Sequence, residues 1–201
     1  MTSAPSDIAR LAHAAAAAAA GPAAAALAAI HVADTALAAA SADPGVGPKL
    51  KALACHRGCA WCCHQVVGVT PAEAALLAQA FAELPRGDQD RIRNRTQDVA
   101  RRGQGLDQRG WWAAKLPCPL LGDDGGCVLH PVRPLPCRAY TSADDGLCRR
   151  SLEGEAVRIP VLAAQWTIYG QAQAGLSAAL AAAGVDPGPV SLVDALAWVL
   201  G

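Results

Sequence analysis

The chain has 201 residues, and 17 Lys and Arg balance 17 Asp and Glu to a net charge of zero. This length predicts one domain or a compact pair, and the charge balance gives no global reason to expect nucleic acid as a partner. Hydrophobic residues make up 53% of the chain but aromatic residues only 4%, because much of the apolar content is alanine. The composition excludes collagenous, disordered and coiled-coil proteins, and it argues against a polytopic membrane protein.

An alanine-rich stretch over residues 11–40 predicts an antiparallel helical hairpin that begins near Asp7, breaks at Gly21-Pro22 and ends before Pro48. Alanine is too weakly apolar for a typical membrane-spanning helix, and histidine and aspartate interrupt the stretch. A secretory signal is not indicated either, because the charges before the stretch cancel and its centre is nearly pure alanine. We therefore expect a cytoplasmic protein with no membrane partner.

A proline- and glycine-rich break over residues 44–48 separates this stretch from a cysteine-rich segment. We expect a mainly α fold with a small β-hairpin or irregular, cysteine-rich, metal-binding core. The expected regions are an alanine-rich helical hairpin over 1–48, a cysteine-rich metal-binding domain over 49–150, and C-terminal helices that pack on it over 151–201.

Local signals predict the elements of the middle region. Residues 66–69 are expected to form a short strand, and Thr70 and Glu73 form a capping box for a helix that ends near Leu84. A polar helix over residues 88–102 carries five arginines, for which a solvated face is the favoured interpretation over a phosphate or RNA contact.

Two further elements are predicted downstream. An Asp-Gly turn between two apolar runs within residues 116–140 predicts a hairpin that brings Cys118 and Cys127 close together. A long helix over 161–183 is followed by a short final helix capped at Ser191. The long helix is expected to bury one face made of Leu162, Trp166, Tyr169, Leu176 and Leu180.

Eight cysteines are grouped rather than spread along the chain, which points to metal before disulfides. Four thiols fall within nine residues, at Cys55, Cys59, Cys62 and Cys63. Adjacent residues rarely aim both side chains at one ion, so we expect Cys62 and Cys63 to have different roles. Four more ligands are expected downstream, with eight, nine and ten residues between them: Cys118, Cys127, Cys137 and Cys148.

Three chemistries compete for these thiols. An iron–sulfur cluster is slightly favoured, because the Cys-x3-Cys-x2-Cys spacing is typical of cluster-binding loops. Zinc is the next choice, with His56, His64 or His130 as substitutes for a sulfur. Disulfides are least favoured without an export signal. The same spacing occurs in radical S-adenosylmethionine enzymes, but this chain lacks their repeated strand–helix units.

The cysteine motifs occur in a recognisable order. The run Cys55-x3-Cys59-x2-Cys62-Cys63 is followed by Cys118-Pro-Leu-Leu121, Cys127-Val-Leu-His130 and Arg133-Pro-Leu-Pro-Cys137-Arg138-Ala-Tyr140. This pattern, over about residues 50–150, resembles the bacterial CxxxCxxCC family of zinc- or iron-chelating domains, to which the cysteine-rich part of flagellin lysine N-methylase is similar. The resemblance implies a metal-binding domain whose cysteines carry the metal.

The leading hypothesis is a metal-binding protein with a cysteine-ligated centre. The alternatives are a metal-dependent protein-modifying enzyme similar to a lysine N-methylase, and a structural zinc module that binds a protein partner. No glycine-rich loop typical of an S-adenosylmethionine site is present, and no catalytic residue is identified. Arg133 and Arg138 are interpreted as structural residues that bond loop carbonyls, with an anion clamp as the alternative.

Overall fold

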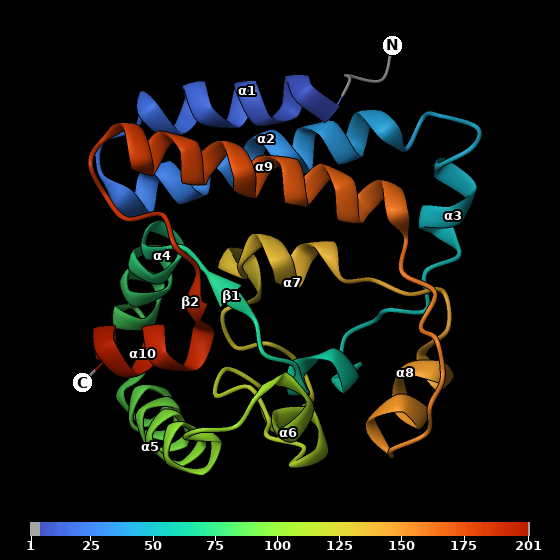
Figure 1. Cartoon of the computed structure of the whole chain (residues 1–201), viewed down its shortest axis with the longest axis vertical. Helices are drawn as coiled ribbons and strands as arrows, with labels where there is room; N and C mark the ends of the chain where they lie inside the picture. The colour runs from blue at the N-terminus through green and yellow to red at the C-terminus, as the bar shows by residue number, and fades with distance from the viewer. Residues whose placement is uncertain (1–4, 201) are drawn as a thin grey trace.

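A computed structural model of the protein describes residues 5–200, which form ten α-helices, two 3-10 helices and a two-stranded sheet (Figure 1). The predicted mainly α class with a minor β component is confirmed. The α-helices are α1 (Pro5–Ala17), α2 (Pro22–Ala40), α3 (Gly47–Lys51), α4 (Pro71–Ala82), α5 (Arg86–Gly103), α6 (Gln108–Ala113), α7 (Leu135–Ala139), α8 (Asp145–Leu152), α9 (Ala163–Ala182) and α10 (Leu192–Leu200). The remaining elements are the 3-10 helices η1 (Trp61–His64) and η2 (His130–Val132) and the strands β1 (Gly68–Val69) and β2 (Val190–Ser191).

The helices α1, α2 and α9 form one side of the molecule, which we call the helical layer (Figure 1). The predicted helical hairpin is confirmed: α1 and α2 are joined through Gly21, whose φ of 95° lies in the region that favours glycine, and Pro22 starts α2. The helices approach closely because the residues on their contact faces are small. A Cβ atom at Gly175 of α9 would lie 2.2 Å from the carbonyl oxygen of Ala9 in α1.

The buried face of α9 differs from the predicted one at Trp166, which is 51% exposed. Tyr169 and Leu176 are buried as expected. The buried stripe passes through positions 165, 168, 169, 172, 175, 176, 179 and 180, and Trp166 lies outside it. The expectation that Trp166 packs in the core is therefore wrong. The face of α9 that packs against the alanine-rich helices α1 and α2 is narrower than the sequence pattern indicated.

A second core lies among α4, α5 and α10, with the sheet beside it. The predicted capping box is present, because Thr70 Oγ1 accepts from the Glu73 backbone N–H and the Glu73 carboxylate accepts from the Thr70 backbone N–H. The predicted strand is shorter than expected, and β1 pairs with β2 in antiparallel register. The predicted hairpin after residue 116 is reduced to one antiparallel bridge between Leu121 and Cys127.

Helix α5 turns its charged side to solvent, in agreement with the favoured interpretation. Asp98 pairs with Arg101 and Arg102 of the same helix, while Ile92 and Val99 face the core. One arginine does more than this: Arg95 donates to the backbone oxygen of Leu121 and pairs with Asp123. The helix thereby holds the loop that carries the downstream cysteines.

Among residues 5–200, α2 is the only helix that is both long and apolar enough to cross a membrane, and it lies in the helical layer with Ala26, Ala29 and Ala33 buried. The helical layer is continuous with the rest of the fold, since α2 packs on α4 and α9 packs on α7. The expected division into regions 1–48, 49–150 and 151–201, and the absence of a membrane partner, stay predictions.

Candidate metal centre

The first cysteine loop is shaped by a glycine and clamped to a second loop. Gly58 has a φ of 90°, which lets the chain turn between Cys55 and Cys59. A Cβ at Gly125 would lie 2.8 Å from the Gly58 carbonyl oxygen, so the two loops touch through their backbones. The Arg57–Asp124 ion pair, 2.5 Å between Nη2 and Oδ2, joins the same two loops.

The second loop carries Cys118 and Cys127. The Cys118 backbone N–H donates to the Cys63 carbonyl at 2.7 Å, which places the two cysteines side by side. The loop closes where the Gly122 N–H donates to Gly126 O, and the bridge from Leu121 to Cys127 brings the second cysteine back toward the first. The sequence prediction that the turn draws Cys118 and Cys127 together agrees with this geometry.

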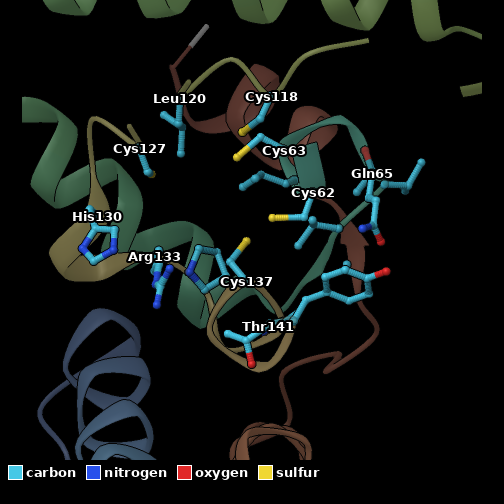
Figure 2. A pocket seen from close by; sticks show the side chains of 18 of the residues that line it. Cys62, Cys63, Gln65, Cys118, Leu120, Cys127, His130, Arg133, Cys137 and Thr141 are labelled. Atoms are coloured by element: carbon cyan, nitrogen blue, oxygen red, sulfur yellow. The ribbon is translucent and has the colours of Figure 1, made fainter. Parts of the chain in front are cut away.

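Seven cysteines line one cavity, and five of them appear together in Figure 2. We call these five the inner cysteines: Cys62, Cys63, Cys118, Cys127 and Cys137. Figure 2 shows the sulfurs of Cys63 and Cys118 adjacent to each other, with the sulfurs of Cys62 and Cys137 directed into the same space. The residues come from η1, from the second loop and from α7, three segments that are far apart in the sequence.

The other three, Cys55, Cys59 and Cys148, are the outer cysteines. The Ser142 backbone N–H donates to the Cys55 sulfur at 3.3 Å, and Cys148 is buried on α8, which packs against η1. Neighbouring thiolates at Cys55 and Cys59 contribute to raising the pKa of Cys148, to about 11, after burial as the main cause. The three outer thiols therefore lie within electrostatic reach of one another.

Cys62 lies between the two groups. When ionised, Cys62 contributes to the raised pKa of Cys59 and Cys148 on the outer side, and of Cys118 and Cys137 on the inner side. A hydrogen bond with Cys63, followed by burial, raises the pKa of Cys62 itself. The expectation that Cys62 and Cys63 differ in role stays a prediction. The position of Cys62 suggests one such difference, because Cys62 lies within electrostatic reach of both groups of cysteines.

Burial favours the protonated state at three of the inner thiols, Cys118, Cys127 and Cys137. It raises the pKa of Cys137 to about 12 and also raises those of Cys118 and Cys127, and at Cys118 and Cys137 nearby thiolates add to the effect. The positive charge of Arg133 acts in the opposite direction at Cys127 and Cys137. Metal binding at these thiols must therefore release protons, and it would replace the penalty of burying charge with metal–sulfur bonds.

The donor set fits a thiophilic metal, although the sulfurs do not converge on one point. Among residues 5–200, no three His, Cys, Asp or Glu side chains lie close enough together to hold a single ion. Tetrahedral zinc at a Zn–S distance of about 2.3 Å needs sulfurs about 3.8 Å apart. Instead, seven of the eight cysteines, all but Cys148, line a cavity of about 1040 Å³ whose wall includes no Asp or Glu. Soft thiolates select zinc or iron–sulfur clusters over hard cations.

The histidines proposed as substitute ligands are held in different ways. His56 Nδ1 lies 2.8 Å from Ala54 O, and His64 Nδ1 lies 3.2 Å from Ala60 O, so both rings bond to carbonyls of their own loop. His130 lines the cavity, and burial together with the charge of Arg133 lowers its pKa. A neutral imidazole at that place remains able to ligate metal.

The two arginines of the downstream motif behave differently. Arg138 donates to the carbonyls of Arg133 and Pro131 and pairs with Asp34 of α2, which is the structural role that the sequence favoured. Arg133 lines the cavity, and its buried Nε has no hydrogen-bond partner. Sequence reasoning treated the two together, because nothing in the motif distinguishes them.

Sequence reasoning also missed several residues of the wall. Thr141 lines the cavity beside the motif tyrosine, and Trp166 comes from α9, where it packs edge-to-face on Tyr140 with ring centroids 6.2 Å apart. The carboxylate of buried Glu73 accepts from the Leu135 backbone N–H at 2.8 Å and so fixes the start of the helix that carries Cys137. Only the capping-box pattern signalled Glu73, and it did not indicate this second bond.

A mainly helical fold with cysteines from three stretches of sequence around one cavity defines a cysteine-rich metal-binding protein. The family model described as "CxxCxxCC: Putative zinc- or iron-chelating domain" matches residues 54–157, slightly more than half of the chain. The chain belongs to this family, which confirms the resemblance seen in its motifs. Neither a curated protein nor a solved structure gives a significant match.

Proposed function

We propose that the inner cysteines hold an iron–sulfur cluster, and that the protein uses it as a cysteine-ligated redox or binding centre. The observation that carries this proposal is the spread of the inner sulfurs around a shared space. A cluster contains several metal atoms, each bound by its own thiolate, so it needs more widely spaced sulfurs than a single zinc ion does.

Four of the five inner cysteines suffice for a cluster. Cys118 and Cys137 come from different segments, and burial of the sulfurs raises the pKa of both thiols. The outer cysteines, with Cys62 beside them, would form a second site. When bound, a cluster supplies one-electron chemistry, while Arg133 offsets part of the negative charge that the thiolates bring into the cavity.

The remaining expectations are part of the same proposal. The eight cysteines are free thiols, which suits a reducing compartment, so we propose a cytoplasmic location. Nucleic acid is not a proposed partner, because the arginines of α5 are largely neutralised within their own helix. A protein substrate or partner remains part of the hypothesis without an assigned surface.

The test is anaerobic purification of the full chain, followed by measurement of iron, zinc and acid-labile sulfide and an absorption spectrum before and after reduction. We expect iron and sulfide in matching amounts and a broad visible band that bleaches with dithionite. The variant C118S/C137S should lose this band, whereas the single variant C55S should keep it. Stoichiometric zinc without iron or sulfide would overturn the cluster and support a structural zinc site.

A further inference from the structure

The cavity extends well beyond the inner cysteines. Its wall continues along α9 through Trp166, Gly170 and Gln173, and it passes Trp111 of α6 on the way. Small-molecule sites usually enclose about 300–1,000 Å³ and are mainly apolar with a few polar groups. The volume of about 1040 Å³ therefore leaves room for an organic ligand beside a metal centre.

Three polar atoms of this wall are buried without a hydrogen-bond partner: Trp111 Nε1, Arg133 Nε and Thr141 Oγ1. Trp111 is 8% exposed and Thr141 is 6% exposed, so bulk water does not compensate these groups. Unsatisfied buried polar groups are rare in folded proteins because each one is costly. The indole and guanidinium N–H groups can only donate hydrogen bonds, so these two unpaired groups would be satisfied by a hydrogen-bond acceptor.

The charged side chains of the cavity wall also favour a ligand that carries an acceptor group. No Asp or Glu lines the cavity, and its arginines are Arg57 and Arg133. Arg57 is neutralised by Asp124. Arg133 lines the cavity and has no carboxylate within ion-pair distance among residues 5–200, so no acidic side chain neutralises its charge.

We propose that this cavity binds a small organic anion with an aromatic or apolar body, whose acidic group is recognised by Arg133 with help from Trp111 and Thr141. The apolar body would lie along the wall that Trp166 and Tyr140 provide, where aromatic rings offer flat contact area. The proposal goes beyond the metal centre and does not depend on which metal the cysteines hold.

The experiment compares two fluorescent probes on the full-length, metal-loaded protein. The first is 8-anilino-1-naphthalenesulfonate, and the second is N-phenyl-1-naphthylamine, which has the same body without the sulfonate. We expect saturable binding of one sulfonate probe per chain. The variants R133Q and W111F should weaken the sulfonate probe, R133Q by about tenfold as for one lost charged hydrogen bond, and should leave the neutral probe unchanged.

Matched controls separate this site from folding and from metal binding. R158Q removes an exposed arginine outside the cavity and should leave both probes unchanged. T141V removes a hydroxyl at nearly constant volume. If R133Q does not fold, T141V replaces it in the test and should weaken binding of the sulfonate probe. Metal content is measured for each variant.

Two results would overturn the proposal. One is unsaturable or equal binding of the two probes by the wild-type protein. The other is an R133Q variant that loses metal yet binds the sulfonate probe as tightly as the wild type, because Arg133 would then serve only as the counter-ion of the metal centre. A protein without metal that still discriminates the probes would refute the proposed function and leave this inference standing.

Discussion

The helical layer and the cysteine-bearing region, residues 54–148, hold their structure by different means. The three helices of the layer have 13 to 20 residues, and they pack through alanine, leucine and isoleucine. The cysteine-bearing region relies on α6, α7, η1 and η2 of three to six residues near its thiols. The same region also contains α4 and α5, which have 12 and 18 residues and share a core with α10. Helices shorter than about 12 residues are marginal by themselves, so the segments that carry the thiols need another source of order. Under the proposed function, metal ligation would supply that order, because the free energy of metal binding would add to the free energy of folding.

A polar network links the two regions. The Tyr169 hydroxyl of α9 donates to Asp34 of α2 at 2.7 Å, and Asp34 also pairs with Arg138, the neighbour of Cys137. Arg138 in turn holds the carbonyls of the preceding loop. The helical layer therefore positions one inner cysteine through hydrogen bonds, while the other inner cysteines depend on loop contacts.

The largest expected effect in the helical layer is the loss of a buried leucine. Leu176 is fully buried, so Leu176→Ala should lower the free energy of unfolding by about 2–5 kcal/mol through lost burial and a cavity. The exposed Leu11 of α1 provides the same substitution as a control, with little effect expected. Urea denaturation followed by circular dichroism measures both. Equal losses for the two variants would contradict the packing described for the layer.

The next effect is a pH dependence at Tyr169. Burial and the hydrogen bond to Asp34 raise the pKa of Tyr169 to about 12, against about 10 in an unfolded chain. The folded state favours the neutral phenol. The resulting contribution to the free energy of unfolding is therefore complete below pH 10 and is lost as the pH rises through 12. The loss should be about 2–3 kcal/mol. Denaturation between pH 9 and 12 should show a flatter dependence for Tyr169→Phe, and identical slopes would refute the shift.

A smaller effect is expected where α1 and α9 touch. Gly175→Ala places a Cβ against the Ala9 carbonyl and should cost about 1–3 kcal/mol through overpacking. Gly170 of the same helix has nothing within 4 Å of its Cβ position, so Gly170→Ala should gain up to about 1 kcal/mol in helix propensity. Thermal melts of both variants test this difference in sign. A stabilising Gly175→Ala would show that the helices lie further apart.

The smallest effect is expected on the solvated face of α5. Asp98 pairs with Arg101 and Arg102, and all three side chains are more than 40% exposed. Asp98→Ala should therefore change the free energy of unfolding by less than about 0.5 kcal/mol, because water and salt screen such pairs. Denaturation at low and high salt measures it. A loss above 1 kcal/mol would indicate that this face is packed rather than solvated.

Local signals explain why much of the fold could be predicted. The Gly21-Pro22 break and the capping box at Thr70 and Glu73 are read within a few residues, and both occur as expected. The pairing of β1 with β2 could not be predicted, because two-residue strands carry little pattern and about 120 residues separate them. Trp166 was misassigned because helical periodicity alone does not show how wide the partner surface is.

The candidate site was predictable in composition but not in arrangement. The spacing of Cys55, Cys59, Cys62 and Cys63 indicated a metal site with different roles for Cys62 and Cys63, and that interpretation stays a prediction. Which thiols face one another depends on η1 and on the contact between Gly58 and Gly125, which bring distant loops together. Arg133 and Arg138 look alike in the motif, and only tertiary contacts separate a structural arginine from one that faces the cavity.

The most direct test of the central claim, that metal bound by the cysteines holds residues 54–148 together, is hydrogen exchange by mass spectrometry before and after the metal is removed. We expect peptides that carry the thiols, within 54–64, 116–140 and 142–148, to lose protection when the metal is stripped, while peptides of α1, α2 and α9 keep most of theirs. Unchanged protection throughout 54–148 would contradict the claim, because it would show that apolar packing alone orders the cysteine-bearing region.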